Sequence, residues 1–326
     1  MLKPMRVPVL LLTSLVLALS PPLTRAQGSD PAEVVRAYQL WTGGQAKAAI
    51  ALLEPLLQPT PQGFTDSDLG VGWEILGSSY QDLEMYDQAR QAYVRAMEKL
   101  RPLPSEQAQY AATIDNFATL EDAQGHRTEA KLLCEKARHI YAAIGDRSGM
   151  GLTSIDLAVI AYTQKDFKGA RRALAEAMQE ISRATPISGD NVAEMDSVKS
   201  ALALHDGKDV EAVSAIDQSI DLWTRAHGPD YFLLGTGYLQ RAQAFAKRKD
   251  YGRAAADAQR SLAIAEASVG RNSLAYVTAE GIYAQILRES GEKDEASRLK
   301  KDASSTLASL RGRQCYGCTI DASGFR

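Results

Sequence analysis

Cysteine is scarce in this chain of 326 residues, and the motifs of the common catalytic and phosphate-binding sites are missing. Its three cysteines and four scattered histidines show no spacing typical of a four-ligand structural zinc site. No glycine-rich loop precedes a helix in the arrangement that binds phosphate, and neither HExxH nor GxSxG occurs. The sequence therefore predicts no catalytic residues, no cofactor and no metal, and we do not expect an enzyme.

Basic runs are missing as well, although charged residues are frequent. The chain has 37 Lys and Arg against 40 Asp and Glu, which gives a formal net charge of −3. A mildly acidic chain without basic runs binds nucleic acid and anionic membrane surfaces poorly. We therefore expect no nucleic-acid partner.

Long apolar runs are confined to the N-terminus, where residues 1–26 have the features of a signal peptide. Lys3 and Arg6 give a positive start, residues 7–19 form an apolar run, and Ala26 offers a small residue for cleavage. The run is too short to cross a bilayer as a helix. We expect export to the periplasm or secretion, with no membrane span in the mature chain; an uncleaved anchor is the alternative.

An internal repeat occupies most of the remaining chain. Seven alanines recur at intervals of 40 to 42 residues, and a turn position lies five residues before each of them. These anchor alanines are Ala49, Ala89, Ala130, Ala170, Ala212, Ala254 and Ala296. The turn positions are Gly44, Glu84, Gly125, Lys165, Gly207, Lys249 and Gly291. The pattern indicates stacked helix pairs that bury their apolar faces against their neighbours.

The clearest copy runs from Trp73 to Ala96 and reads Trp-x2-Leu-Gly-x2-Tyr-x8-Ala-x3-Tyr-x2-Ala. It resembles the tetratricopeptide repeat, and the long intervals resemble the kinesin-light-chain type and its exported bacterial relatives. The resemblance implies an all-α fold, a right-handed superhelical solenoid of about seven antiparallel helix pairs over residues 30–310. The fifth unit departs most from the pattern, because Lys199 and Ser200 stand where leucine and glycine are usual.

The resemblance also implies a partner-binding surface, because the first helix of each pair lines the concave face in this family. The family's inward positions carry acids, amides and aromatic groups, with no Lys or Arg among those of the second to fifth units. An acidic groove of this kind suits a basic or polar extended peptide, although the acids of a solvated face would give the same pattern. The predicted partner-binding residues are Tyr38, Trp41, Glu74, Gln81, Asp82, Asp115, Asn116, Thr119, Asp122, Asp156, Tyr162 and Glu194.

Two of the three cysteines, Cys315 and Cys318, lie in a tail over residues 311–326. A local disulfide and two free thiols are the main alternatives for this pair, followed by an intermolecular thiol or metal contact and by redox function. The third, Cys134, falls at a core position of the third unit, where a small buried side chain is expected.

Together these features predict an exported, non-catalytic scaffold that binds a protein or extended peptide partner in an acidic concave groove, with a basic peptide as one candidate. The alternative is a structural or self-assembling envelope component that uses its terminal repeats or its cysteine tail, so self-association is a further expectation.

Overall fold

The structure is a computed structural model that describes residues 31–58 and 63–314, with side chains as far as 310. These residues form fourteen α-helices and one short 3-10 helix, and the described ranges contain no strand. In chain order the elements are α1 (Ala32–Thr42), α2 (Ala46–Leu57), α3 (Asp66–Asp82), α4 (Tyr86–Leu100), η1 (Pro104–Glu106), α5 (Gln107–Ala123), α6 (Arg127–Ile144), α7 (Arg147–Thr163), α8 (Phe167–Ile181), α9 (Gly189–His205), α10 (Asp209–His227), α11 (Leu233–Lys247), α12 (Tyr251–Ser268), α13 (Leu274–Ser290) and α14 (Lys293–Gln314).

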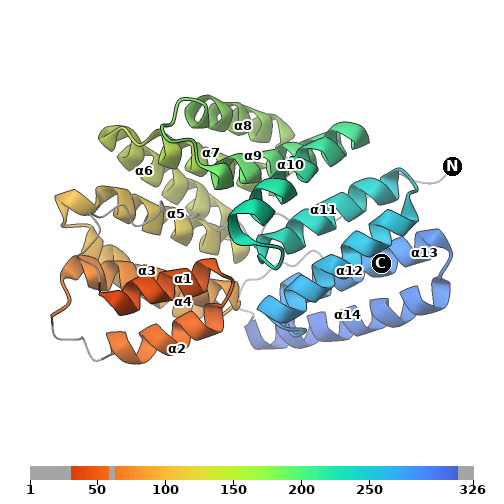
Figure 1. Cartoon of the computed structure of the whole chain (residues 1–326), viewed down its shortest axis with the longest axis horizontal. Helices are drawn as coiled ribbons and strands as arrows, with labels where there is room; N and C mark the ends of the chain where they lie inside the picture. The colour runs from red at the N-terminus through yellow and green to blue at the C-terminus, as the bar shows by residue number, and fades with distance from the viewer. Residues whose placement is uncertain (1–30, 59–62, 315–326) are drawn as a thin grey trace.

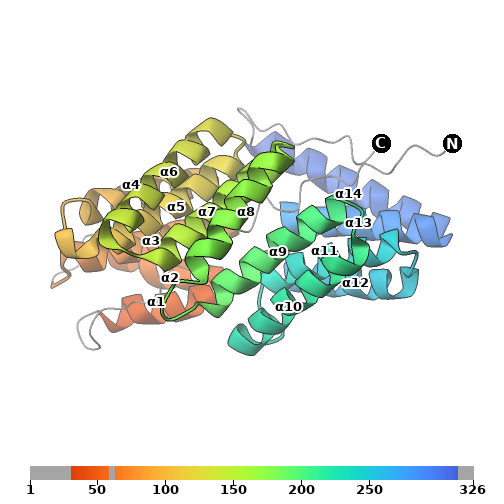
Figure 2. The same cartoon turned by 90° about the horizontal axis from the view of Figure 1, so that it is seen from above.

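Consecutive helices pack as seven antiparallel pairs, from α1 with α2 to α13 with α14, and the pairs stack into a curved solenoid (Figures 1 and 2). This confirms the predicted all-α, right-handed superhelical fold of the tetratricopeptide type. The last helix ends at Gln314, beyond the predicted end of the repeats at residue 310. No helix in the described part of the chain is long and apolar enough to cross a membrane.

The seven predicted turn positions all adopt positive φ angles, so each pair is closed by a residue in the left-handed region. Four are glycines, for which this conformation carries no steric cost. The other three are Glu84, Lys165 and Lys249, with φ of 58°, 63° and 61°. The backbone N–H groups here bond back to the preceding helix, as Lys165 N–H does to the Tyr162 carbonyl at 2.9 Å. The period read from the sequence therefore marks where each first helix ends.

The anchor alanines are all buried, and a small residue is required wherever two helices cross closely. Gly77 shows why. A Cβ added at Gly77 would lie 2.8 Å from Cδ1 of Tyr93 on the paired helix. The tyrosine hydroxyl is held in turn by Gln81 Oε1, to which it donates at 2.9 Å. The small and large residues of the repeat pattern thus form one packing unit in the α3–α4 pair.

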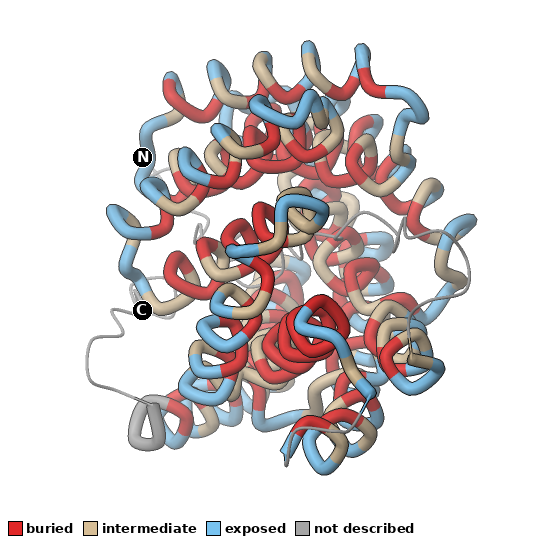
Figure 3. The backbone as a smooth tube through the Cα atoms, turned by 90° about the vertical axis from the view of Figure 1, so that its left-hand side faces the viewer, coloured by how far each residue is buried: buried red, intermediate tan, exposed pale blue. Residues whose placement is uncertain are grey.

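The odd-numbered helices, α1 to α13, are the inner helices, because each also packs against the next odd-numbered helix. The inner helices are buried on most sides; in α3 every residue from Ser67 to Tyr80 is buried. The even-numbered outer helices alternate buried and exposed positions (Figure 3). The unusual fifth unit pairs like the others: the Ser200 hydroxyl donates to the Ala212 carbonyl at 2.8 Å, and Lys199 points outward.

The superhelix closes on itself where its first units meet α11 and α13 (Figure 1). The Glu84 carboxylate, in the turn between α3 and α4, accepts the backbone N–H of Leu274 at 2.5 Å. Phe232 packs against the hydrophobic core of the first two units, and its Cδ1 lies 3.7 Å from where a Cβ would stand at Gly44. We call this contact region the seam.

Candidate binding site in the interior of the superhelix

Polar side chains connect each inner helix from α1 to α9 to the next inner helix, one repeat further along the chain. The bonds are Trp41 Nε1 to Asp82 at 3.0 Å, Asn116 Nδ2 to Glu74 at 2.9 Å, Thr153 Oγ1 to Asp115 at 3.2 Å, Asn191 Nδ2 to Ser148 Oγ at 3.0 Å, and Ser197 Oγ to Gln240 at 3.2 Å. They satisfy buried polar groups that would otherwise oppose the packing of the inner helices.

The structure places most predicted partner-binding residues in this polar interior. Glu74, Asp115, Asp156 and Glu194 are each at most 5% exposed, so they do not form a solvated face. Several bond to one another, as Gln81 Nε2 does to Thr119 Oγ1 at 2.9 Å. The polar groups assigned to a partner therefore also hold the inner helices together.

Asp115 and Asp156 form a hydrogen-bonded pair at the centre of the interior, on α5 and α7. Burial raises the pKa of Asp115 to about 7, although hydrogen bonds from Thr153, Asp156 and Cys134 oppose the shift. Burial and the neighbouring Asp115 raise the pKa of Asp156 well above its ordinary value. Of the two acids, Asp156 is therefore the one whose protonated form is favoured, and in that form it can donate to Asp115. Burial likewise keeps the Cys134 thiol protonated, because it raises its pKa well above the usual range.

Glu194 on α9 extends this acidic cluster. Neither of its carboxylate oxygens has a hydrogen-bond partner, and neither oxygen of Asp156 accepts a hydrogen bond. Burial, followed by the negative charges of Asp190 and Asp115, raises the pKa of Glu194 well above its ordinary value. We call Asp115, Asp156 and Glu194 the acid cluster. It is a group of buried acids with raised pKa values and with acceptor oxygens that receive no hydrogen bond.

The remaining predicted residues lie apart from the acid cluster. Asp122 lies near the end of α5, where burial raises its pKa to about 6 against the opposing charge of Arg127. Tyr38 and Trp41 form an edge-to-face pair on α1, with ring centroids 5.9 Å apart. Asp82 lies at the seam, and Trp41 lies next to it because its indole N–H donates to the Asp82 carboxyl.

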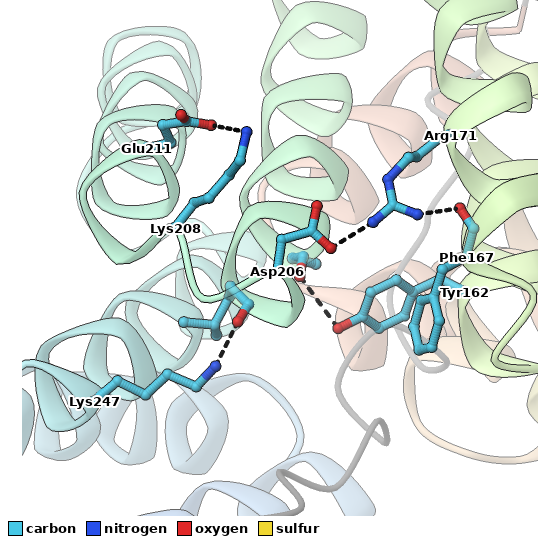
Figure 4. A network of polar contacts seen from close by, with 9 residues as sticks. Tyr162, Phe167, Arg171, Asp206, Lys208, Glu211 and Lys247 are labelled. Carbon is cyan, nitrogen blue, oxygen red and sulfur yellow. Dashed lines mark hydrogen bonds and ion pairs between the residues drawn. The ribbon is translucent and has the colours of Figure 1, made fainter.

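Tyr162 lies at the C-terminal end of α7, and its hydroxyl donates to the Ala201 carbonyl at 3.3 Å (Figure 4). Around it, Arg171 of α8 bonds to Asp206, and Lys247 of α11 bonds to the carbonyl of Leu204 (Figure 4). These contacts continue the connection between neighbouring units, and the tyrosine serves there as an inter-helix contact.

Three residues that the sequence prediction missed belong to this interior. The carboxylate of Asp190 bonds to His227 Nε2 at 2.7 Å, and the His227 ring stacks on Tyr231 with centroids 4.1 Å apart. The Tyr231 hydroxyl is buried without a partner. All three lie at or beside inter-unit loops, where the helical period carries no signal.

No group of His, Cys, Asp or Glu within the described ranges could hold a metal ion. Cys134 is buried and forms no disulfide with any residue that the structure describes. The predicted signal peptide, residues 1–26, and the Cys315–Cys318 pair lie outside the described residues, so both stay predictions.

Fold and interior define a tetratricopeptide-repeat solenoid, and solved structures of such proteins are similar to it. One is the APC/C hetero-tetramer Cut9–Hcn1, with a TM-score of 0.57 and 12% identity, covering 86% of this chain. The match spans 55% of that chain, about half its length. A Rap protein in complex with Competence and Sporulation Factor has a TM-score of 0.57 and 13% identity, over 86% of this chain and 77% of the other. Such low identities show the fold alone. No protein-family model matches the chain, and no curated protein matches it in sequence.

Proposed function

We propose that this protein is an exported, non-catalytic scaffold whose interior binds a basic extended segment of a partner protein. The similar structures support a scaffold in general terms, because both are complexes, one with Hcn1 and one with Competence and Sporulation Factor. The basic character of the segment comes from this chain's own residues.

The observation that carries the proposal is that Asp156 and Glu194 of the acid cluster bury oxygens that accept no hydrogen bond. Burying a carboxyl oxygen without a donor costs free energy, typically about 1–3 kcal/mol for an unsatisfied polar group. Asp156 and Glu194 are 2% and 5% exposed, and both offer oxygens that accept no hydrogen bond. The neighbouring charges that act most strongly on Asp156 and Glu194 are those of other acids, not of Lys or Arg. A Lys or Arg side chain from a partner would supply both the missing donors and the missing charge.

Binding of a basic segment should also release protons from the acid cluster. A cation beside a carboxyl group favours the charged form and lowers its pKa. Acids that are protonated in the free protein would therefore ionise and release protons when the basic segment binds. Because the acids are buried, the segment gains access only when the inner helices part, which the flexible stacking of a solenoid permits through small changes at several interfaces.

Affinity capture from the exported fraction tests the proposal. The baits are the wild-type protein, an interior variant with Asp156→Asn and Glu194→Gln, and a control variant with Asp221→Asn and Glu129→Gln at exposed positions of outer helices. These substitutions keep side-chain size and remove only the ability to ionise. We expect a partner retained by the wild type and the control and lost by the interior variant.

Calorimetric titration of the captured partner's basic segment, in buffers with different ionisation enthalpies, then measures the proton release. Net release in the wild type and none in the interior variant would support the role of the acid cluster. If all three baits retain the same proteins, the acid cluster does not bind the partner. Recovery of the protein alone by every bait would favour the self-assembling alternative.

Export is tested separately by the intact mass of the protein recovered from the periplasm and the medium. We expect the mass of a chain that begins at Gln27. A chain that keeps residues 1–26 in the membrane fraction would instead support the anchor.

A further inference from the structure

A pocket lies in the seam, between the turns of the first two units and helices α11, α12 and α13. It holds about 950 Å³ of space not filled by protein atoms, part of which is open to solvent. Both ends of the described solenoid contribute to it: Gly44, Asp82 and Glu84 from the first two units, and Ala275 and Thr278 from the seventh. The pocket therefore exists only because the superhelix closes.

The walls of the seam pocket combine an apolar part with an acidic part. Phe232, Leu239 and Val269 supply apolar surface, and the hydroxyl-bearing residues Thr236, Ser261, Ser268 and Thr278 lie among them. The acidic part consists of Asp82 and Glu84, the only charged side chains among the described lining residues, which include no Lys or Arg. Pockets for small molecules commonly have this composition, with a few polar groups that orient the ligand.

Asp82 supplies the group that would meet a positive charge. Its Oδ2 accepts the indole N–H of Trp41 at 3.0 Å, which fixes the orientation of the carboxyl. Burial raises the pKa of Asp82 to about 8, despite that bond. A cation entering the pocket would favour the ionised form of Asp82. It would then form a charge-assisted hydrogen bond with the carboxylate.

Glu84, at the acidic end of the pocket, adopts a backbone conformation that costs free energy. It is one of the three turn positions with positive φ that are not glycine, a conformation that costs roughly 1 kcal/mol for a residue with a Cβ. Its carboxylate accepts the N–H groups of Leu274 and Ala275 at the first turn of α13. Glycine would fit the turn better but could not close the pocket against α13.

We propose that the seam pocket binds a small organic cation with an aromatic or branched apolar group, its positive end at Asp82 and its apolar group against Phe232 and Leu239. The lining suits neither an anion nor a metal ion. An anion would find no basic side chain among the described lining residues, and a metal ion would find no cluster of three ligands within the described ranges. The inference does not depend on the proposed partner binding, because the acid cluster does not line this pocket.

Binding of three small molecules, two amines and one carboxylic acid, to the full-length protein tests the proposal. It is measured by calorimetry and by thermal unfolding. Tryptamine carries a cation and a ring, indole-3-propionate an anion and a ring, and butylamine a cation without a ring. We expect tryptamine to bind and to raise the melting temperature, and each of the other two to bind at least about tenfold more weakly. Equal binding of tryptamine and indole-3-propionate, or binding of neither, would overturn the proposal.

Two variants assign the binding to the pocket. Asp82→Asn should weaken tryptamine binding about tenfold, because it removes the charge and keeps the acceptor for Trp41. Thr278→Leu should abolish it by filling the space, whereas Thr128→Leu, at an exposed position of α6, should leave it unchanged. If Thr278→Leu retains full affinity, the ligand binds elsewhere and the proposal fails.

Hydrogen exchange distinguishes this site from the interior. Tryptamine should slow exchange of the Leu274 and Ala275 amides, which close the pocket, more than that of amides on α7. The Glu194→Gln variant should bind tryptamine like the wild type. Loss of binding in that variant, with Thr278→Leu unaffected, would place the cation in the interior and refute the seam pocket.

Discussion

Replacing Asp115 by asparagine should make the protein less sensitive to alkaline pH. The Asp115 carboxyl has a pKa of about 7 in the folded chain, against an ordinary value of 3.8. Between these two values the folded state binds more protons than the unfolded state, so the free energy of unfolding falls as the pH rises. The contribution of Asp115 to the free energy of unfolding is therefore fully present below about pH 3.8, falls as the pH rises above that value, and is lost once the pH has passed through about 7.

The size of the effect follows from the difference of about three pH units between the two states. Each unit corresponds to about 1.4 kcal/mol, which gives an upper bound of about 4 kcal/mol. Water entering the interior and the neighbouring Asp156 proton reduce this bound, so we expect about 1–3 kcal/mol. The amide side chain introduced by Asp115→Asn keeps an acceptor for the Thr153 hydroxyl, which bonds to the aspartate at 3.2 Å, so the packing is preserved.

Urea unfolding followed by circular dichroism measures the difference. At about pH 3 the Asp115→Asn variant and the wild type should have similar free energies of unfolding, because the aspartic acid is protonated there in both the folded and the unfolded state. At about pH 8 the variant should be more stable by the amount given above. The exposed Glu129→Gln substitution on α6 serves as a control and should follow the wild type. A variant that loses as much stability as the wild type over this range would refute the assignment of a raised pKa to Asp115.

Three further predictions concern packing and reactivity. Lys165→Gly should stabilise the protein by roughly 0.5–1 kcal/mol in thermal unfolding, because φ is 63° there; a loss of stability would mean that the lysine side chain contributes more than its backbone costs. Gly77→Ala should destabilise it by about 1–3 kcal/mol, since the new methyl group would meet the Tyr93 ring at 2.8 Å; an unchanged urea midpoint would show that the ring can move aside. The third prediction uses a variant in which the other two cysteines are replaced by serine. Its Cys134 should react with a thiol reagent only as fast as the third unit opens, because the thiol is fully buried and protonated. Rapid reaction in the native protein would contradict this.

The sequence predicts the repeat in detail because its signals are local. A small anchor such as Ala89 and a turn such as Gly125 are required by the crossing of two helices that are adjacent in the chain, so each unit repeats them. Even the departures fall at the expected places: Lys165 and Lys249 hold turn positions where glycine is usual, and both adopt its conformation.

The interior could be predicted only as a set of inward positions. Helical periodicity places Asp156 on the inner face of α7, but it does not state how tightly the superhelix winds. That winding depends on small packing differences that add up over several units, and it decides that Asp156 is 2% exposed. The seam is harder still to predict from the sequence, because Glu84 and Leu274 are 190 residues apart and belong to different units. The one local sign is a glutamate at a turn position in the second unit.

The seam also has a consequence for the order in which the chain assembles. In a solenoid without long-range contacts, each unit can dock as soon as its neighbour has folded. Glu84 leaves the ribosome long before Leu274 does, and chains fold from the N-terminus as they are synthesised. The first units therefore fold with the docking surface for Phe232 and the Glu84 carboxylate still open. The final step is the arrival of α11 and α13, which ties the first and last units into one cooperative body. A chain interrupted before α13 should accordingly keep its helices but unfold gradually from its ends.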